Sequence, residues 1–411
     1  MSRYATAALA ALTIAACADQ PTAPAAVAPA DGATLARTTE APASPGIWRP
    51  VVTGETGPGA QYAFYVPRDN WNGEVVYYAH GIRLPSDPID LNVGNGFDAF
   101  RDALGAEGYA VAYSSFSENG FAVKDGAQRT HQLRGLFASE FGKPTRSYLT
   151  GTSLGGLMAE AIAEQHGSQY DGTLAMCAPL GGSVSEIQYL ADVRVVFDWF
   201  YKDVVPGDAM NVPPGTNPDA AVAAAVGAII RNPNGLGAML RIRQTPLEGR
   251  TPNEWITGIA YAIKYNILAL DDLLDHTHGH PFYDNSETDY TGALPAAMLL
   301  ALNGKIVGVP GVDRFTATPD AINYLDKYYQ PTGELRVPTL TLHTTNDPFV
   351  PRRLHEAQFL SAVSAAGASS LLVQRHVDTA VFGHCTFKTS DMVTAFNDLA
   401  TWVRTGTKPA S

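Results

Sequence analysis

The chain has 411 residues, of which 45% are hydrophobic and 17% charged, and its mean hydropathy is -0.05. This balance is typical of a packed globular protein and excludes a mainly disordered or fibrous chain. The 28 basic and 40 acidic residues give a net charge of -12, which disfavours nucleic acid as a partner because phosphates require surplus basic side chains. Three cysteines, Cys17, Cys177 and Cys385, are too few for a disulfide-stapled scaffold.

The N-terminus carries the pattern of an export signal. Residues 4–16 form an apolar run behind Arg3 that is too short to span a bilayer, which favours a signal peptide. Its end, IAAC at 14–17, resembles the bacterial lipobox and so implies acylation of Cys17 at the mature N-terminus. We therefore expect export from a bacterial cytoplasm, with membrane contact only through this anchor. A secreted or periplasmic protein with an ordinary signal peptide is the alternative.

Composition divides the chain into four parts. A signal peptide at 1–17 precedes an Ala/Pro-rich stretch at 18–46, which predicts a semi-extended linker. Residues 47–182 and 336–404 alternate strand-like and helix-like patterns, and so predict an α/β catalytic domain with a mostly parallel sheet flanked by helices. Residues 183–335 have helical patterns broken by Pro and Gly, and predict a mainly helical cap inserted after the sixth strand.

The elements follow from the spacing of apolar residues. Strands are expected, in chain order, at 62–66, 75–80, 109–113, 147–150, 173–177, 338–343 and 371–376. Helices are expected at 97–107, 132–141, 154–166, 185–205, 218–231, 253–274, 318–329, 351–366 and 390–403. Because ligands bind at the carboxyl ends of the strands in such sheets, site residues are expected there.

One serine lies in a motif suited to nucleophilic catalysis. Residues 151–155 read GTSLG, which is the pattern G-x-S-x-G, between a predicted strand and a predicted helix. Glycines on both sides permit the sharp turn that exposes a serine Oγ, and the start of the helix directs backbone N–H groups at the site. We therefore predict Ser153 as the nucleophile.

A serine nucleophile needs a base and an acid that orients the base. With this motif the chain order is serine, acid, histidine. Asp347 follows the next-to-last predicted strand and His384 follows the last one, as this order requires. Asp378 is a rival acid, but it stands between the last strand and His384, from where the far nitrogen of the ring is harder to reach.

An oxyanion hole needs two backbone donors beside the nucleophile. One is expected to be the N–H of Leu154, the residue after the serine. The other is expected from the loop after strand 75–80, where Gly81 lets the backbone approach closely. We favour the N–H of Ile82 and place Gly81 second, while His80 is expected to pack or hydrogen-bond locally.

The remaining histidines are interpreted as structural. His343 and His376 lie within predicted strands. The spacing H-x-H-x-H of His276, His278 and His280 could bind a metal, but a surface loop is favoured because no Cys or paired acidic motif accompanies it. The sequence therefore predicts a site with no metal and no cofactor.

Together these motifs resemble the α/β-hydrolase superfamily, through HG at 80–81, GTSLGG at 151–156, ND-P at 346–348 and GHC at 383–385. The stretches LAMCAPLGG, LTLHTTNDPFVP and GHCTF are similar to secreted bacterial esterases and prolyl-oligopeptidase-like hydrolases. A cysteine after the catalytic histidine also resembles tannases and feruloyl esterases, where it bonds a cysteine just before the catalytic serine. Thr152 stands at that position here, so aromatic-ester specificity does not carry over.

The resemblance implies a serine hydrolase. The preferred hypothesis is a carboxylic ester hydrolase that forms an acyl-enzyme with a small-molecule or polymer-derived ester. A serine exopeptidase with the same triad and a non-catalytic anchored binding protein are the alternatives. The carboxylates of the cap that could anchor the free amine of a peptide are Asp192, Asp198, Asp271 and Asp272.

Two cysteines remain once Cys17 is assigned to the lipid. Cys177 ends the strand beside the nucleophile strand, and Cys385 follows His384, so both are expected at the carboxyl edge of the sheet. In an oxidising compartment we expect a Cys177–Cys385 disulfide that holds the histidine loop. Two buried thiols are the alternative.

Overall fold

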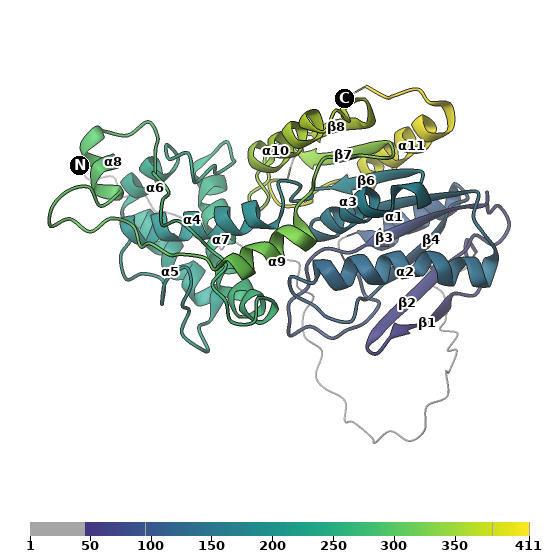
Figure 1. Ribbon diagram of the computed structural model, residues 1–411, viewed down its shortest axis with the longest axis horizontal. Coiled ribbons are helices and arrows are strands. Elements are labelled where there is room, and N and C mark those ends of the chain that lie inside the picture. Colours follow the sequence, from purple (N-terminus) through teal and green to yellow (C-terminus); the bar gives the residue numbers. More distant parts are fainter. Residues whose placement is uncertain (1–45, 95, 380, 411) are drawn as a thin grey trace, which may run out of the picture.

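The computed structural model describes residues 46–94, 96–379 and 381–410. The predicted signal peptide, Cys17 and most of the linker lie outside the described residues. Figure 1 shows a central sheet with helices on its faces at one end of the molecule and a cluster of helices at the other.

The sheet has eight strands in the order β1-β2-β4-β3-β5-β6-β7-β8. The strands β1 and β2 pair antiparallel, as do β2 and β4, and every other pair is parallel. This mostly parallel sheet, covered by helices, confirms the expected fold class. Their bounds are β1 Val52–Gly57, β2 Ala60–Tyr65, β3 Glu74–Ala79, β4 Ala110–Ser114, β5 Arg146–Thr152, β6 Gly172–Met176, β7 Thr339–Thr344 and β8 Leu372–Val377.

The register of the central strands brings their carboxyl ends to one edge. Every residue of β3, β6 and β7 is buried, as expected of parallel strands covered on both faces. Ala79 of β3 pairs with Gly151 of β5, which in turn pairs with Ala175 of β6. The loops after these three strands therefore leave the sheet side by side.

Helices cover both faces of the sheet. Apolar side chains of α1 (Phe97–Ala106) and α11 (Thr389–Thr405) form one buried cluster with the strands. Side chains of α2 (Val123–Phe141) and α3 (Leu154–His166) form another such cluster. Helix α10 (Arg352–Ala365) joins a third cluster, which α3 shares with the cap.

The chain between β6 and β7 folds into helices. Their bounds are α4 Ser183–Phe200, α5 Pro218–Arg231, α6 Pro233–Met239, α7 Pro252–His276, α8 Ala296–Leu302 and α9 Pro319–Tyr329. Asn217, Thr251 and Thr318 cap α5, α7 and α9, each with a proline at the start of the helix, which is the favoured sequence for a helix start. Among the described residues, no helix combines the length and apolarity that crossing a bilayer requires.

Four segments differ from the sequence prediction. Helix α2 begins at Val123, nine residues before the expected start at 132. Its first turns lack a helical spacing of apolar residues and instead pack against α3. Gly126 of its first turns lies so close to α3 that an added Cβ would be 2.5 Å from Met158 Sδ. Strand β1 was missed because its glycines weaken the strand pattern, and α6 and α8 were missed because each has only seven residues.

Candidate active site

A strained turn presents Ser153 between β5 and α3. Its φ of 55° and ψ of −128° are uncommon for a residue with a side chain. A Cβ added to Gly151 would lie 2.2 Å from the carbonyl oxygen of Gly155, and one added to Gly155 would lie 2.1 Å from that of Ala79. Both glycines of the motif are therefore required, because the turn crosses the backbone of β3 in close contact.

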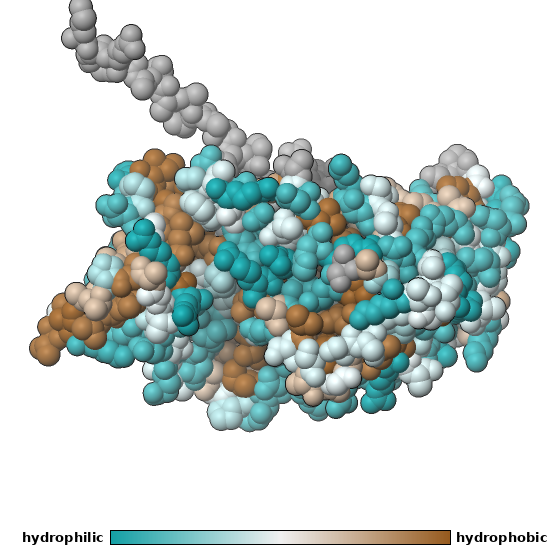
Figure 2. Space-filling view, turned by 90° about the horizontal axis from the view of Figure 1, so that it is seen from above, coloured by the Kyte–Doolittle hydropathy of each residue, from teal (hydrophilic) through white to brown (hydrophobic). Residues whose placement is uncertain are grey.

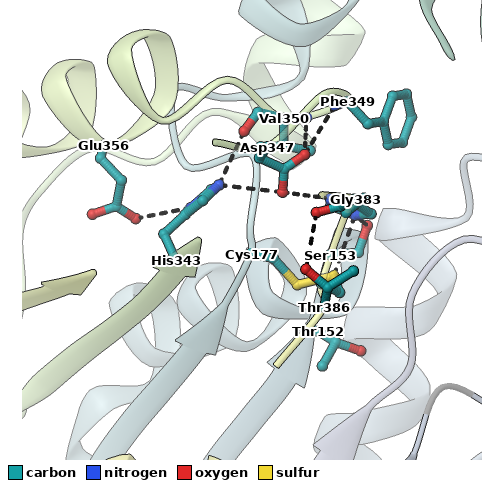
Figure 3. Close-up of a disulfide and its surroundings, with 12 residues drawn as sticks. Thr152, Ser153, Cys177, His343, Asp347, Phe349, Val350, Glu356, Gly383 and Thr386 are labelled. Carbon is teal, nitrogen blue, oxygen red and sulfur yellow. Dashed lines mark hydrogen bonds and ion pairs between the residues drawn. A yellow bond between two sulfur atoms is a disulfide. The ribbon is translucent and has the colours of Figure 1, made fainter. Parts of the chain in front are cut away.

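The structure brings Ser153, His384 and Asp347 into one hydrogen-bonded line (Figure 3). Ser153 Oγ is 2.8 Å from Nε2 of His384, and Nδ1 of that ring is 2.8 Å from Oδ2 of Asp347. Each residue follows the carboxyl end of a different strand, namely β5, β8 and β7. Asp347 is fully buried and Ser153 nearly so.

Backbone donors orient the carboxylate of Asp347. Its Oδ1 accepts the N–H groups of Phe349 and Val350, both at 2.9 Å, which leaves Oδ2 directed at His384. Burial alone raises the pKa of Asp347, but the charge of His384 and a hydrogen bond from His343 outweigh it and hold the pKa well below the usual range. The carboxylate is therefore ionised at neutral pH.

Behind Asp347 lies a second buried pair that the sequence did not reveal. His343 Nε2 donates to the carbonyl of Val350 at 2.9 Å and lies 3.5 Å from Oδ2 of Asp347. Its Nδ1 lies 3.5 Å from Oε1 of Glu356 on α10. Burial alone lowers the pKa of His343, but its contacts with Asp347 and Glu356 outweigh this and raise it to about 10. A positive imidazolium thus stands between two buried carboxylates (Figure 3).

The cap also contacts Asp347 directly. Oε2 of Glu248, in the segment before α7, accepts the backbone N–H of Asp347 at 3.1 Å. Its Oε1 accepts the N–H of Arg353 in the first turn of α10 at 3.0 Å. Because Glu248 is buried, these bonds are shielded from water. No sequence motif marks Glu248, since its role depends on how the cap packs against the sheet.

The expected oxyanion donors lie at the elbow or in the loop that faces it. Leu154 is the first residue of α3, so its N–H is one of the four that helix geometry leaves without an intrahelical acceptor. A Cβ added to Gly81 would lie 3.2 Å from Ser153 Cβ and 3.3 Å from the carbonyl oxygen of Thr152. The loop that contains Gly81 and Ile82 therefore passes directly against the serine.

His80, in the same loop, contacts two backbone carbonyl groups and an aromatic ring. Its Nδ1 is 2.7 Å from the carbonyl oxygen of Gly81, its Nε2 is 3.3 Å from that of Ser115, and its ring stacks on Phe116. Burial lowers the pKa of His80 to about 4, so the ring is neutral at physiological pH.

A disulfide fixes the loop that carries the histidine. Cys177 and Cys385 form a disulfide (Figure 3), with their Cα atoms 5.5 Å apart. The Sγ atom of Cys385 lies 3.3 Å from Nε2 of His384. The bond links the residue after the histidine to the residue after β6. Within the described part of the chain, only Cys177, His384 and Cys385 group three potential metal ligands, and their two sulfurs are bonded to each other.

The other carboxylate and histidines considered for the site lie away from Ser153. Asp378 forms an ion pair with Arg250 and accepts a hydrogen bond from Thr345. His376 is exposed on β8. Of the three closely spaced histidines, His276 ends α7, while His278 and His280 are exposed in the turn that follows.

Aromatic residues connect the cap to His384. The ring of Phe349 lies perpendicular to that of His384, with centroids 5.2 Å apart. Tyr265 of α7 stacks on the ring of Phe349 with centroids 4.1 Å apart, and the ring centroid of Tyr261 lies 5.8 Å from that of Phe349. Helix α7 therefore forms an aromatic wall beside the site.

Two hollows adjoin these residues. A cavity of about 280 Å³ extends from His384 and Thr152 toward Phe387 and Met392, and it approaches the size of small-ligand pockets. A much smaller crevice, of about 10 Å³, lies between Ile82 and the α7 residues Tyr265 and Asp272.

Comparisons with known proteins found similar structures but no similar sequence. No family model matches the chain, and no curated protein matches its sequence. Among solved structures, the esterase LipA of Xanthomonas oryzae, in a mutant form, aligns over 85% of this chain and 90% of its own, at 14% identity and a TM-score of 0.42.

Two further structures align to a similar extent. A putative hydrolase of Legionella pneumophila covers 87% of this chain and 90% of its own, at 13% identity and a TM-score of 0.45. An esterase of Aspergillus oryzae covers 87% and 80%, at 17% identity and a TM-score of 0.43. The chain has the α/β-hydrolase fold. This assignment rests on the strand order and the elbow geometry described above, because the similarity scores are low.

Proposed function

We propose that the protein is a serine hydrolase that cleaves carboxylic esters. The observation that carries this proposal is the line from Ser153 Oγ through the His384 ring to Asp347, with 2.8 Å at each step. A serine hydroxyl is inert at neutral pH without such a base, and the base needs an acid that fixes its tautomer.

In the proposed reaction, Ser153 Oγ attacks the ester carbonyl while Nε2 of His384 takes its proton. Asp347 stabilises the imidazolium that forms, and the N–H groups of Leu154 and Ile82 bind the oxyanion. The imidazolium then protonates the leaving alkoxide. Water, activated by the same nitrogen, cleaves the acyl-enzyme and restores the hydroxyl of Ser153.

Ester cleavage is favoured over exopeptidase activity by the contacts of the cap carboxylates. Asp192 accepts hydrogen bonds from two buried tyrosine hydroxyls, and Asp198 pairs with the buried Arg194. Asp272 lines the small crevice beside Ile82, but it already accepts the N–H of Phe121. These three carboxylates are thus engaged within the fold, so the binding of a peptide amine by any of them requires the loss of an existing bond, whereas the fourth candidate, Asp271, is exposed on α7.

The test replaces the nucleophile. Ser153→Ala is expected to lower kcat on p-nitrophenyl acetate by at least about a thousandfold and to abolish labelling by a fluorophosphonate probe. Ser369→Ala, at an exposed serine far along the chain, is the matched control and should keep both. Full labelling of Ser153→Ala would exclude Ser153 as the nucleophile. Faster turnover of an aminoacyl-p-nitroanilide than of the ester would favour the exopeptidase.

We further propose that this hydrolase is exported and tethered through an acylated Cys17. The lipobox resemblance supports the anchor, and a disulfide beside the site suits an oxidising compartment. The mass of the mature N-terminal peptide tests this proposal, because acylation adds the lipid to Cys17 and an ordinary signal peptidase does not.

A further inference from the structure

One end of the cap is unusually apolar. Six large apolar side chains are exposed among the described residues, and three of them, Leu300, Val307 and Val309, lie within ten positions of one another. They belong to residues 293–310, which comprise α8 and the loop after it and are called the apolar tip below. Scattered exposed apolar side chains are normal, whereas a cluster of them marks an interaction surface.

The charge of the apolar tip sets it apart from the rest of the chain. No acidic residue occurs between Asp289 and Asp313, although the chain has a net charge of -12. The one charged residue of the tip is Lys305, whose Nζ pairs with Asp289 at 2.7 Å. The tip therefore presents an apolar surface without negative charge.

The fold holds this surface in a fixed shape. The N–H of Lys305 donates to the carbonyl of Leu300, and that of Val312 donates to the carbonyl of Leu302. The backbones of Gly304 and Gly311 touch, since a Cβ on Gly311 would lie 2.5 Å from the nitrogen of Gly304. The loop is thus closed at its base and projects its fully exposed Val307 outward.

The tip projects from the molecule and has aromatic residues at its base. Figure 2 shows a narrow hydrophobic projection at the left end of the molecule, where Figure 1 places α8 and the adjoining loop. Half-buried Trp199 donates its indole N–H to the carbonyl of Pro310, and its ring packs edge-on against Phe200. Tryptophan in this position is typical of side chains at the membrane–water boundary.

We propose that the apolar tip inserts into the surface of a lipid bilayer. A narrow projection buries little area against a second copy of the chain, whereas it enters a fluid lipid surface readily. The linker permits this contact, because residues 18–45 in extended form reach about 90 Å, more than the diameter of a domain of this size. The tip supplies a second membrane contact beside the proposed acyl chain, and stable membrane association takes two such signals.

The test uses the chain from residue 18 onward, which lacks the acylation site and keeps every described residue. Flotation with vesicles of phosphatidylethanolamine and phosphatidylglycerol measures its binding. Val307→Glu is expected to lower the partition coefficient by about tenfold or more, because it puts a charge where the proposed insertion places an apolar side chain in the bilayer. Ile230→Glu, at an exposed apolar residue of α5 outside the tip, is the matched control and should bind as the parent does.

The possible outcomes distinguish a lipid bilayer from a second copy of the chain as the partner of the tip. Equal flotation of Val307→Glu and the parent chain would overturn the proposal. The proposal would also be overturned if the parent chain did not bind vesicles and sedimented as a dimer, and if Val307→Glu dissociated that dimer. The tip would then bind a second copy of the chain. The result is independent of catalysis, since Ser153→Ala should float like the parent and all tip variants should keep their turnover of a soluble ester.

Discussion

Removal of the disulfide is expected to weaken both the fold and the site. Cys177 and Cys385 are separated by 208 positions, so their bond closes a large ring in the unfolded chain. In the chain-entropy model, a ring of this length is worth about 5 kcal/mol at 25 °C. The double variant Cys177→Ala/Cys385→Ala is therefore expected to lose about 3 to 5 kcal/mol of its free energy of unfolding, because measured values usually fall short of the model.

Activity should fall for a separate reason. Cys385 directly follows His384, so the bond restrains the loop that holds Nε2 at 2.8 Å from Ser153 Oγ. A displacement of about 1 Å at a reacting group can cost on the order of a hundredfold in rate. We expect kcat on p-nitrophenyl acetate to fall by about tenfold to a hundredfold, under conditions in which the variant is still folded.

Urea unfolding followed by tryptophan fluorescence, together with kcat, measures both effects. Cys17→Ser is the matched control because it removes a cysteine and keeps the bond. Reduced wild type should behave like the double variant. Unchanged unfolding free energy would refute the ring argument, and a less stable variant with unchanged kcat would refute the claim that the bond positions His384.

Two other perturbations test the surroundings of the site. Glu248→Ala leaves the backbone N–H groups of Asp347 and Arg353 without their buried acceptor, so it should destabilise the protein by about 1 to 3 kcal/mol and lower kcat. Glu287→Ala, at an exposed glutamate, is the control. Equal loss of stability and kcat in both variants would refute the role assigned to Glu248. The pKa of His80 is about 4 in the folded state against 6.5 in the unfolded chain. The unfolded chain therefore binds more protons below pH 6.5, and the free energy of unfolding decreases as the pH is lowered toward 4. Between pH 7 and 4.5 this histidine should cost about 2 to 3 kcal/mol, and His80→Gln should flatten the unfolding free energy over that range by the same amount.

The sequence was most informative where a local pattern sufficed. The bounds of α3 and α5 match the structure residue for residue, because both helices have a clear start and stop. Ser153, Asp347 and His384 could be selected because parallel strands place their carboxyl ends together, whatever the loops contain.

The parts that could not be predicted depend on packing between distant segments. Glu248 reaches Asp347 from 99 positions away, and Glu356 reaches His343 from a helix on the other side of a turn. Neither glutamate lies in a sequence motif that marks its role. A carboxylate on a helix or in a loop is ordinarily solvated, so the sequence offered no reason to expect either one at the site. The four-residue spacing of His343 and Asp347 was visible, but its meaning depends on how the turn after β7 folds back on the strand.

The ring closed by the Cys177–Cys385 disulfide has a consequence for proteolytic cleavage. All the helices of the cap, the aromatic wall and the apolar tip lie between Cys177 and Cys385. A protease that cuts once in any loop of this region therefore yields two fragments that stay covalently joined. A nicked molecule would run as one species on a non-reducing gel and as two after reduction. Such a molecule would retain His384 beside Ser153 after its chain had ceased to be continuous.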